Sequence, residues 1–287
     1  MSRVLVTGAS GFVGRHALAP LVAHGFEVHV IARTRRNVPG VIWHSLDLLS
    51  QSADPLLAEL RPSHLLHSAW ITEHGRYWGA SENADWLRAS QDLIEAFARH
   101  GGRRVVGVGS CAEYDWTQEG DVPWPETRSC VPATLYGQAK RDLAAWLDTA
   151  GLDYAWARLF FLFGEGESPQ RIVPYLLQCA LNGETARCTS GLQVRDFLST
   201  RLCGEYLAAV VASDLTGAVN VASGQGITLR DLVEPIEAAT GRTLNVDFGA
   251  LPDRPGDPVS IVADVTRLRE LGVPIQDLVA ELVRIAD

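Results

Sequence analysis

Short apolar runs alternate with longer mixed segments through the first 160 residues of the chain. The apolar runs predict strands, and the mixed segments near 13–24, 53–60 and 82–100 predict the helices between them. Strands that alternate with helices are typical of βαβ units and a parallel sheet. We therefore expect an α/β protein with a Rossmann-type doubly wound parallel sheet. The predicted strands are 3–7, 27–32, 41–45, 63–69 and 103–110.

A helix at 136–150 and a strand at 153–161 extend this pattern, which becomes less regular after Gly164. A further helix near 170–182 and a strand at 193–199 precede a stretch rich in proline and glycine at 249–258. We therefore expect two interleaved parts. Residues 1–160 form a cofactor-binding Rossmann domain that carries the catalytic residues, and residues 161–287 form a smaller, mainly substrate-binding part.

Composition and charge exclude several kinds of partner. The chain has 287 residues, a hydrophobic content of 47% and a formal net charge of −9, which argues against a nucleic-acid surface. The five cysteines lack paired spacing, so we expect free thiols. No apolar stretch approaches the ~20 residues that span a bilayer, and the first strand leaves no room for a signal peptide. We expect a cytoplasmic protein without a membrane partner, and the spacing of His and Cys predicts no metal site.

The segment TGASGFVG places three glycines between the first strand and the first helix. Gly8, Gly11 and Gly14 follow the order that brings a backbone turn and a helix N-terminus close to a pyrophosphate. The alternative is a tight turn without a ligand. We expect a dinucleotide there, with the cofactor contacted by Gly8, Gly11, Phe12, Val13, Gly14, Arg33, Asp47, Leu48, Ser68, Ala69, Tyr136 and Lys140.

Arg33 stands at the end of the second strand, where an NAD-binding protein usually places an acidic residue. A guanidinium pairs well with a phosphate and offers nothing selective to a ribose hydroxyl, so Arg33 favours NADP(H). NAD is the alternative cofactor, since Arg33 can also be a solvated loop residue. Arg15, Arg35 and Arg36 are further candidates for the phosphate, and Asp47 is a candidate for the adenine edge.

Polar residues follow a buried strand at 105–110, where the carboxyl ends of a parallel sheet form a ligand crevice. Ser110 is the first of them. Tyr136 and Lys140, in the segment YGQAK, are four residues apart on one face of a predicted helix. A neighbouring ammonium is expected to lower the tyrosine pKa towards neutrality, which suits proton transfer. Together the three residues predict a catalytic set.

Several segments resemble one known family, the extended short-chain dehydrogenases/reductases, in the NAD(P)-dependent epimerase/dehydratase group that acts on nucleotide sugars. The similar segments are TGASGFVG, SHLLHSA, SCAEY, YGQAK, RLFFLFGEGE, GLQVRDFLS, NVASGQGITLRDL and RPGDP. The resemblance implies Ser110, Tyr136 and Lys140 as the catalytic triad and a nucleotide-sugar substrate. It also implies that Arg195 and Arg254 hold the nucleotide diphosphate, with a structural salt bridge as the alternative, and that the protein is a homodimer.

Three departures from the family pattern narrow the expected reaction. Cys111 and Ala112 stand where sugar 4,6-dehydratases have two carboxylic residues, so we expect no dehydratase activity. Glu113 is displaced by one position, which on a strand points to the other face, and is either structural or a substitute. Phe161 stands in place of the family's substrate-side asparagine.

We expect an NADPH-dependent reductase of a nucleotide-linked 4-keto-6-deoxy sugar, with Tyr136 as proton donor. A nucleotide-sugar epimerase with tightly bound NAD, or a non-catalytic NADP-binding regulatory protein, are the alternatives. Trp70, Trp78 and Trp86 either stack on a base or sugar or pack in the interior.

Overall fold

The computed structural model describes residues 2–118 and 123–286 of the chain. Its largest element is a sheet of seven strands that pair in parallel. Across the sheet the strands are β10 (Gly217–Val221), β6 (Asp153–Leu159), β5 (Arg104–Ser110), β4 (His64–His67), β1 (Arg3–Thr7), β2 (Glu27–Ala32) and β3 (Val41–Ser45). The order reverses at β1, where the chain continues to β2 on one side and returns to β4 on the other. This is the doubly wound arrangement that the sequence predicts, and its crevice lies at the reversal.

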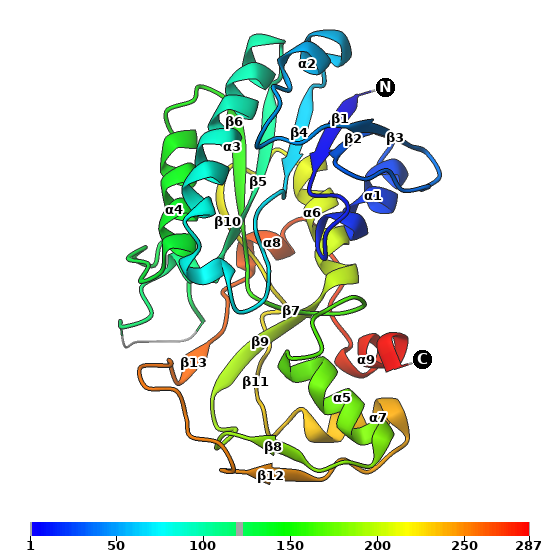
Figure 1. The fold of residues 1–287 in the computed structure, drawn as a ribbon, viewed down its shortest axis with the longest axis vertical. Coiled ribbons are helices and arrows are strands. Elements are labelled where there is room, and N and C mark those ends of the chain that lie inside the picture. The colour runs from blue at the N-terminus through cyan, green and yellow to red at the C-terminus, as the bar shows by residue number, and fades with distance from the viewer. Residues whose placement is uncertain (1, 119–122, 287) are drawn as a thin grey trace.

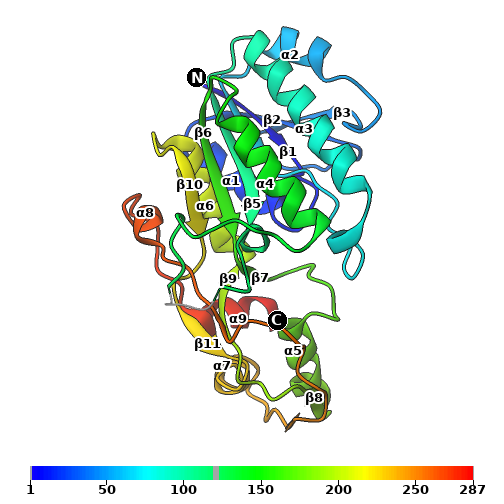
Figure 2. The same ribbon diagram turned by 90° about the vertical axis from the view of Figure 1, so that its left-hand side faces the viewer.

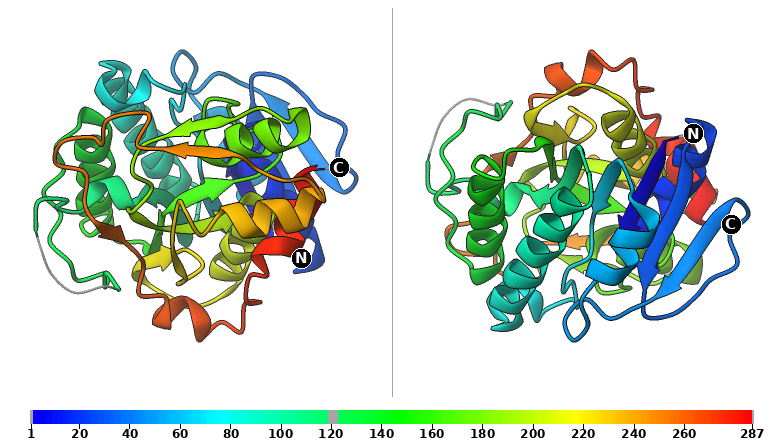
Figure 3. Two further views of the ribbon diagram at one scale, coloured as in Figure 1. Left: turned by 90° about the horizontal axis from the view of Figure 1, so that it is seen from below. Right: turned by 90° about the horizontal axis from the view of Figure 1, so that it is seen from above.

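Helices cover both faces of this sheet, as Figures 2 and 3 show. Successive side chains of a strand point to opposite faces, so Val4 and Val6 of β1 pack into one core and Leu5 packs into the other. The first core includes α1 (Gly14–Ala23) and α6 (Thr200–Ala212). The second includes α2 (Asp54–Leu60), α3 (Glu82–Arg99) and α4 (Leu135–Leu147).

A smaller part lies below the large sheet in Figure 1. Its four-stranded sheet is centred on β9 (Val194–Ser199), which pairs with β7 (Phe161–Phe163), β11 (Gly226–Thr228) and β13 (Ser260–Ile261). Another pair joins β8 (Ala186–Cys188) to β12 (Val246–Phe248). A third apolar core packs these strands against α5 (Ile172–Asn182), α7 (Val233–Thr240) and α9 (Leu278–Ala286).

The chain returns to the large sheet after residue 160. The division of the chain at that residue stays a proposal. Helix α6 and strand β10 both follow residue 160 and belong to the first part by packing. The short helix α8 (Thr266–Arg269) contacts β10 as well. None of the helices in the described ranges is long and apolar enough to cross a membrane.

Candidate active site

A cavity of about 740 Å³ lies at the carboxyl ends of the central strands and extends to the smaller part. Its walls come from loops that follow β1, β2, β4 and β5, from the start of α4, and from β7 and the segment after it. The residues predicted from sequence that line it are Gly8, Gly11, Phe12, Val13, Gly14, Arg33, Asp47, Leu48, Ser68, Ala69, Ser110, Tyr136, Lys140 and Phe161. Fourteen residues from distant segments are thus brought to one hollow.

The glycine loop has the geometry that a pyrophosphate requires. Gly8 has a φ of 71°, and a Cβ atom there would lie 2.6 Å from the backbone nitrogen of Ala69, so only glycine fits. No described side chain caps the first turn of α1, and none of its residues is acidic. The free N–H groups at this end and the positive end of the helix dipole suit an anion. The residues therefore fit a nicotinamide dinucleotide.

Arg33 and Asp47 lie where the adenosine end of such a cofactor would reach. Arg33 is exposed just beyond β2 and lines the cavity. Asp47 accepts a hydrogen bond from the backbone nitrogen of Leu49 at 3.1 Å, so it also shapes its own turn. Arg15 has a different environment, because its guanidinium donates to the carbonyl of Glu165 and thereby ties α1 to the segment after β7. Arg35 and Arg36 are exposed outside the cavity.

Helix α4 brings Tyr136 and Lys140 next to Ser110. The hydroxyl of Thr134 accepts a hydrogen bond from the Gly137 nitrogen at 3.1 Å and caps the helix, which sets Tyr136 in its first turn. Lys140 is buried one turn later, and its Nζ donates to the Val108 carbonyl oxygen at 2.7 Å. Ser110 and Tyr136 line the same cavity, and Ser110 is close enough to lower the pKa of Tyr136. The three predicted catalytic residues therefore meet at one place.

The electrostatics of the pair differ from the sequence-based expectation. Burial raises the pKa of Tyr136, and the neighbouring Tyr77 raises it further. Ser110 acts in the other direction and lowers this pKa. Burial also lowers the pKa of Lys140 to about 7, against the opposing charge of Glu113. The Lys140 Nζ lies 6.0 Å from the Tyr136 ring centroid and is engaged by Val108. The expectation that Lys140 lowers the Tyr136 pKa is therefore wrong for this arrangement, because desolvation dominates.

Aromatic side chains from the segment after β4 surround Tyr136. Tyr77, in the short helix η1 (Tyr77–Gly79), meets its ring edge-on at a centroid distance of 4.9 Å, and Trp78 does so at 5.8 Å. Trp70 is buried beneath Lys140, 3.8 Å from ring centroid to Nζ, and its indole N–H donates to Asn83 at 2.8 Å. Trp70 therefore packs in the interior while lining the cavity.

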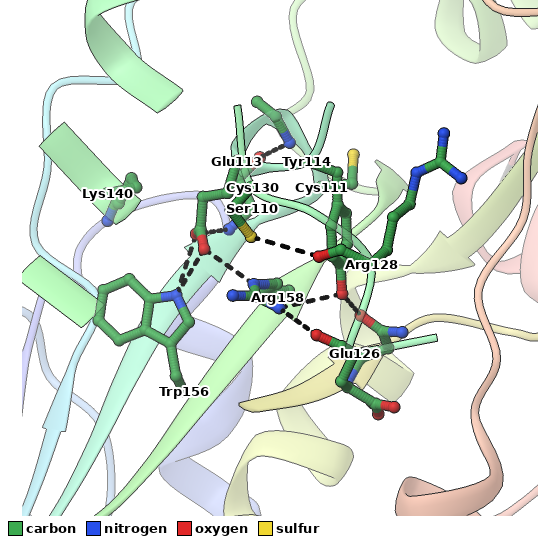
Figure 4. Close-up of polar contacts among 12 residues, drawn as sticks. Ser110, Cys111, Glu113, Tyr114, Glu126, Arg128, Cys130, Lys140, Trp156 and Arg158 are labelled. Atoms are coloured by element: carbon green, nitrogen blue, oxygen red, sulfur yellow. Dashed lines mark hydrogen bonds and ion pairs between the residues drawn. The ribbon is translucent and has the colours of Figure 1, made fainter. Parts of the chain in front are cut away.

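Glu113 is structural in this arrangement. Residues Cys111–Glu113 form a short 3-10 helix, η2, so the strand-based argument about its face was wrong. Its side chain has no exposed surface and accepts hydrogen bonds from the Ser110 backbone nitrogen, the Trp156 indole and the Arg158 guanidinium (Figure 4).

Sequence reasoning missed two charged residues in the segment between β7 and α5. Glu167 and Arg171 both line the cavity. Burial raises the pKa of Glu167 to about 7, and no described group hydrogen-bonds to its Oε2 atom. Arg171 is exposed, and its positive charge lowers the pKa of Tyr77 against the effect of burial. The charges themselves were visible in sequence, but no motif marked them as facing the cavity.

Arg195 and Arg254 lie away from the cavity wall. Arg195 is buried in β9, where it pairs with Asp257 at 2.7 Å and donates to the carbonyls of Val194 and Pro258. Its environment matches the salt-bridge alternative, and its role towards a diphosphate stays a prediction. Arg254 is exposed in the loop between β12 and β13. Within the described ranges, no cluster of three or more His, Cys, Asp or Glu side chains could hold a metal ion.

Known proteins of similar sequence or structure include enzymes that are named for UDP-sugars or were solved with them. A UDP-glucose 4-epimerase of Schizosaccharomyces pombe is 26% identical over 314 residues, which cover 93% of this chain and 87% of that protein. The structure of MoeE5 in complex with UDP-glucuronic acid and NAD has a TM-score of 0.82 and 26% identity, over 99% of this chain and 98% of that one. A UDP-N-acetylglucosamine 4-epimerase of Methanobrevibacter ruminantium M1 shares the fold, with a TM-score of 0.84 and 23% identity over 99% and 97% of the chains.

These relatives support the epimerase alternative better than the reductase that the sequence reasoning preferred. The preference for NADP is also unconfirmed, because several of the similar solved structures are described as complexes with NAD. A family model also matches more than half of the chain. Residues 4–222 fit the model of the NAD dependent epimerase/dehydratase family, and the chain belongs to this family of NAD(P)-dependent enzymes that act on nucleotide sugars.

Proposed function

We propose that this protein is a nucleotide-sugar 4-epimerase that acts on a UDP-linked sugar. The observation that carries the proposal is the meeting of Ser110, Tyr136 and Lys140 in one cavity with the glycine loop. The relatives support the 4-position and the uridine diphosphate, since two similar sequences are named UDP-glucose 4-epimerase. The predicted homodimer and cytoplasmic location stay predictions from the sequence.

A bound nicotinamide cofactor would accept hydride from the sugar carbon and return it. The free N–H groups of the α1 N-terminus would hold its pyrophosphate, and Asp47 and Leu48 would line its adenine end. The chain's own part of the reaction is proton transfer at the sugar oxygen. Tyr136 takes the hydroxyl proton when the ketone forms and gives it back when the hydroxyl is restored. Ser110 holds the same oxygen by a hydrogen bond.

The raised pKa of Tyr136 means that other groups must stabilise its phenolate during the reaction. A phenol whose pKa is raised keeps its proton at neutral pH, so little phenolate is present to accept the proton of the sugar hydroxyl. The positive charge of Lys140 therefore has to act on the phenolate when substrate and cofactor fill the cavity. To do so, Nζ has to break its hydrogen bond to the Val108 carbonyl oxygen, which is 2.7 Å long.

The epimerase proposal is tested by the balance of cofactor and sugar. The purified protein is incubated with UDP-glucose, with UDP-galactose and with a pentose pair, and the products are identified by NMR. We expect interconversion of the two sugars of a pair with no net consumption of cofactor, and NAD among the small molecules released by denaturation. Absence of interconversion with all pairs, in a protein saturated with NAD, would contradict the proposal.

A second candidate, the NADPH-dependent ketosugar reductase, is favoured by one observation. Arg33 lines the cavity at the end of β2, where a 2′-phosphate would lie and where no acidic residue competes for a ribose hydroxyl. A reductase consumes one NADPH for each 4-keto-6-deoxy sugar that it reduces. Stoichiometric loss of NADPH absorbance with such a substrate, together with no interconversion of UDP-hexoses, would select this candidate over the epimerase.

A further inference from the structure

The end of β5 contains a buried carboxylate that reaches backwards along the chain. Glu113 Oε1 accepts a hydrogen bond from the Ser110 backbone nitrogen at 2.7 Å. The Ser110 hydroxyl in turn accepts from the Ala112 nitrogen at 3.2 Å. These two reciprocal bonds form a capping box around η2. They fix the backbone at the point where the strand ends and the Ser110 side chain enters the cavity.

The other oxygen of Glu113 is held by strand β6. Glu113 Oε2 accepts from Arg158 Nε at 2.8 Å and from Trp156 Nε1 at 2.9 Å (Figure 4). Both partners are buried. Burial by itself would lower the pKa of Arg158, but Glu113 raises it above its usual value. The carboxyl group is therefore partnered on both oxygens and held away from solvent.

The backbone of β5 is shaped to admit this carboxylate. A Cβ atom on Gly109 would lie 2.5 Å from Glu113 Oε1 and 2.3 Å from Trp156 Nε1. No side chain other than hydrogen fits there. The close approach of the Glu113 carboxylate thus explains why a glycine precedes Ser110. Gly109 makes the space that Glu113 fills.

Arg158 extends the network to the loop that follows η2. Its Nη1 donates to the Tyr114 hydroxyl at 3.2 Å and to the Glu126 carbonyl oxygen at 3.0 Å. Tyr114 donates onward to Asn220 of β10 at 2.7 Å. Three adjacent strands of the sheet therefore support the residue that holds Ser110.

We propose that Glu113 is a positioning residue, which fixes the orientation of the Ser110 hydroxyl towards the reacting oxygen through its bond to the Ser110 backbone nitrogen. The inference rests on the proposed function of Ser110. Glu113 does not line the cavity in which the substrate would bind. Its effect on turnover must pass through Ser110, and this separates positioning from a general contribution to stability.

The test is a double-mutant cycle between Glu113 and Ser110, with kcat and KM measured on the sugar pair that the parent converts. E113Q places an amide N–H₂ group against one of three donors and is expected to lower kcat by about 10- to 100-fold, with KM little changed. S110A already lacks the hydroxyl, so adding E113Q to it should lower kcat by less than about twofold. An equal loss of kcat in both backgrounds would overturn the proposal.

Two further variants separate positioning from charge and from stability. E113D keeps the negative charge beside Arg158 but is one methylene shorter, so it should lower kcat as E113Q does; full activity in E113D would overturn the proposal. L93A removes a buried side chain of α3 from the apolar core and should lower the stability of the protein without changing kcat. A loss of kcat in L93A equal to that in E113Q would assign the effect to destabilisation.

A readout without substrate distinguishes failure of this inference from failure of the proposed function. The hydrogen exchange of the Ser110 amide is compared by NMR with that of the Val106 amide in the same strand. E113Q or E113D should raise the Ser110 to Val106 rate ratio at least about tenfold, because the bond from this amide to the Glu113 carboxylate is weakened or lost. An unchanged ratio would overturn the positioning role in any case, whereas a changed ratio with no conversion of any sugar would overturn the proposed reaction.

Discussion

Two glutamates near the cavity have opposite environments. Glu113, at the end of β5, has both oxygens occupied by three donors and no exposed surface. Glu167, in the segment between β7 and α5, lines the cavity and has a buried oxygen that no described group hydrogen-bonds. A satisfied carboxylate builds structure, while an unsatisfied one is a cost to folding that a ligand can relieve. The comparison separates the rigid side of the site from the side that is open to a ligand.

Removing the phenolic hydroxyl between the two regions should have the largest effect. Y136F keeps the ring that packs against Tyr77 and Trp78 but cannot move a proton. Because general acid–base catalysis typically contributes ~10²- to 10⁴-fold, kcat should fall by about this factor. Steady-state kinetics measure the loss, and circular dichroism controls for folding. Near-parent turnover in a folded Y136F protein would show that Tyr136 does not carry the proton transfer.

Removing an arginine from each region tests the difference directly. R158M leaves the Glu113 charge buried without its cation, and we expect a loss of about 3–5 kcal/mol in the free energy of unfolding. R171M removes an exposed arginine from the open side and should change stability by no more than about 1 kcal/mol. Urea unfolding of the two variants measures both values. Equal losses would remove the distinction between the regions.

The pKa of Glu167 predicts a pH dependence of stability. Its value is about 7 in the folded protein and 4.5 for the unperturbed group, so between these values the folded state binds more protons than the unfolded state. The contribution of Glu167 to stability is therefore most favourable below about pH 4.5 and becomes less favourable as pH rises to about 7. E167Q should remove this loss and be more stable than the parent by about 1–3 kcal/mol at pH 8, but not at pH 4.5.

The matched control for this prediction is E165Q, two residues away on an exposed carboxylate that does not line the cavity. It should follow the parent at both pH values in urea unfolding. If E167Q also differed from the parent by the same amount at both pH values, titration of Glu167 would not be the cause.

The smallest effect is expected at Arg33, which lies in neither region. R33D should weaken NADP(H) binding by about tenfold or more, since a charge-assisted pair with the 2′-phosphate is replaced by repulsion. Binding of NADH should be unchanged or improved. Calorimetry with both cofactors measures the preference, and tighter binding of NADH than NADPH by the parent would exclude a phosphate role for Arg33. An unchanged kcat at saturating cofactor would show that the substitution left the catalytic residues undisturbed.

Strand and helix periodicity, the glycine loop and the Tyr136–Lys140 spacing were readable from the sequence, because each depends on residues within one or two turns of each other. These local signals predicted the doubly wound sheet and the family. Fourteen of the residues that they singled out line one cavity, since the carboxyl ends of parallel strands meet at one edge, but Arg195 and Arg254 do not.

The tertiary structure alone decided the environment of each charged side chain. Trp156 and Arg158 reach Glu113 only because β5 pairs with β6 in the register that sets Gly107 opposite Trp156 and Gly109 opposite Arg158. The direction of the Tyr136 pKa likewise depends on burial beneath the segment after β4, some 60 residues earlier in the chain. Desolvation and hydrogen bonding act through space, so a spacing in sequence predicts which groups meet but not the charge that each of them carries.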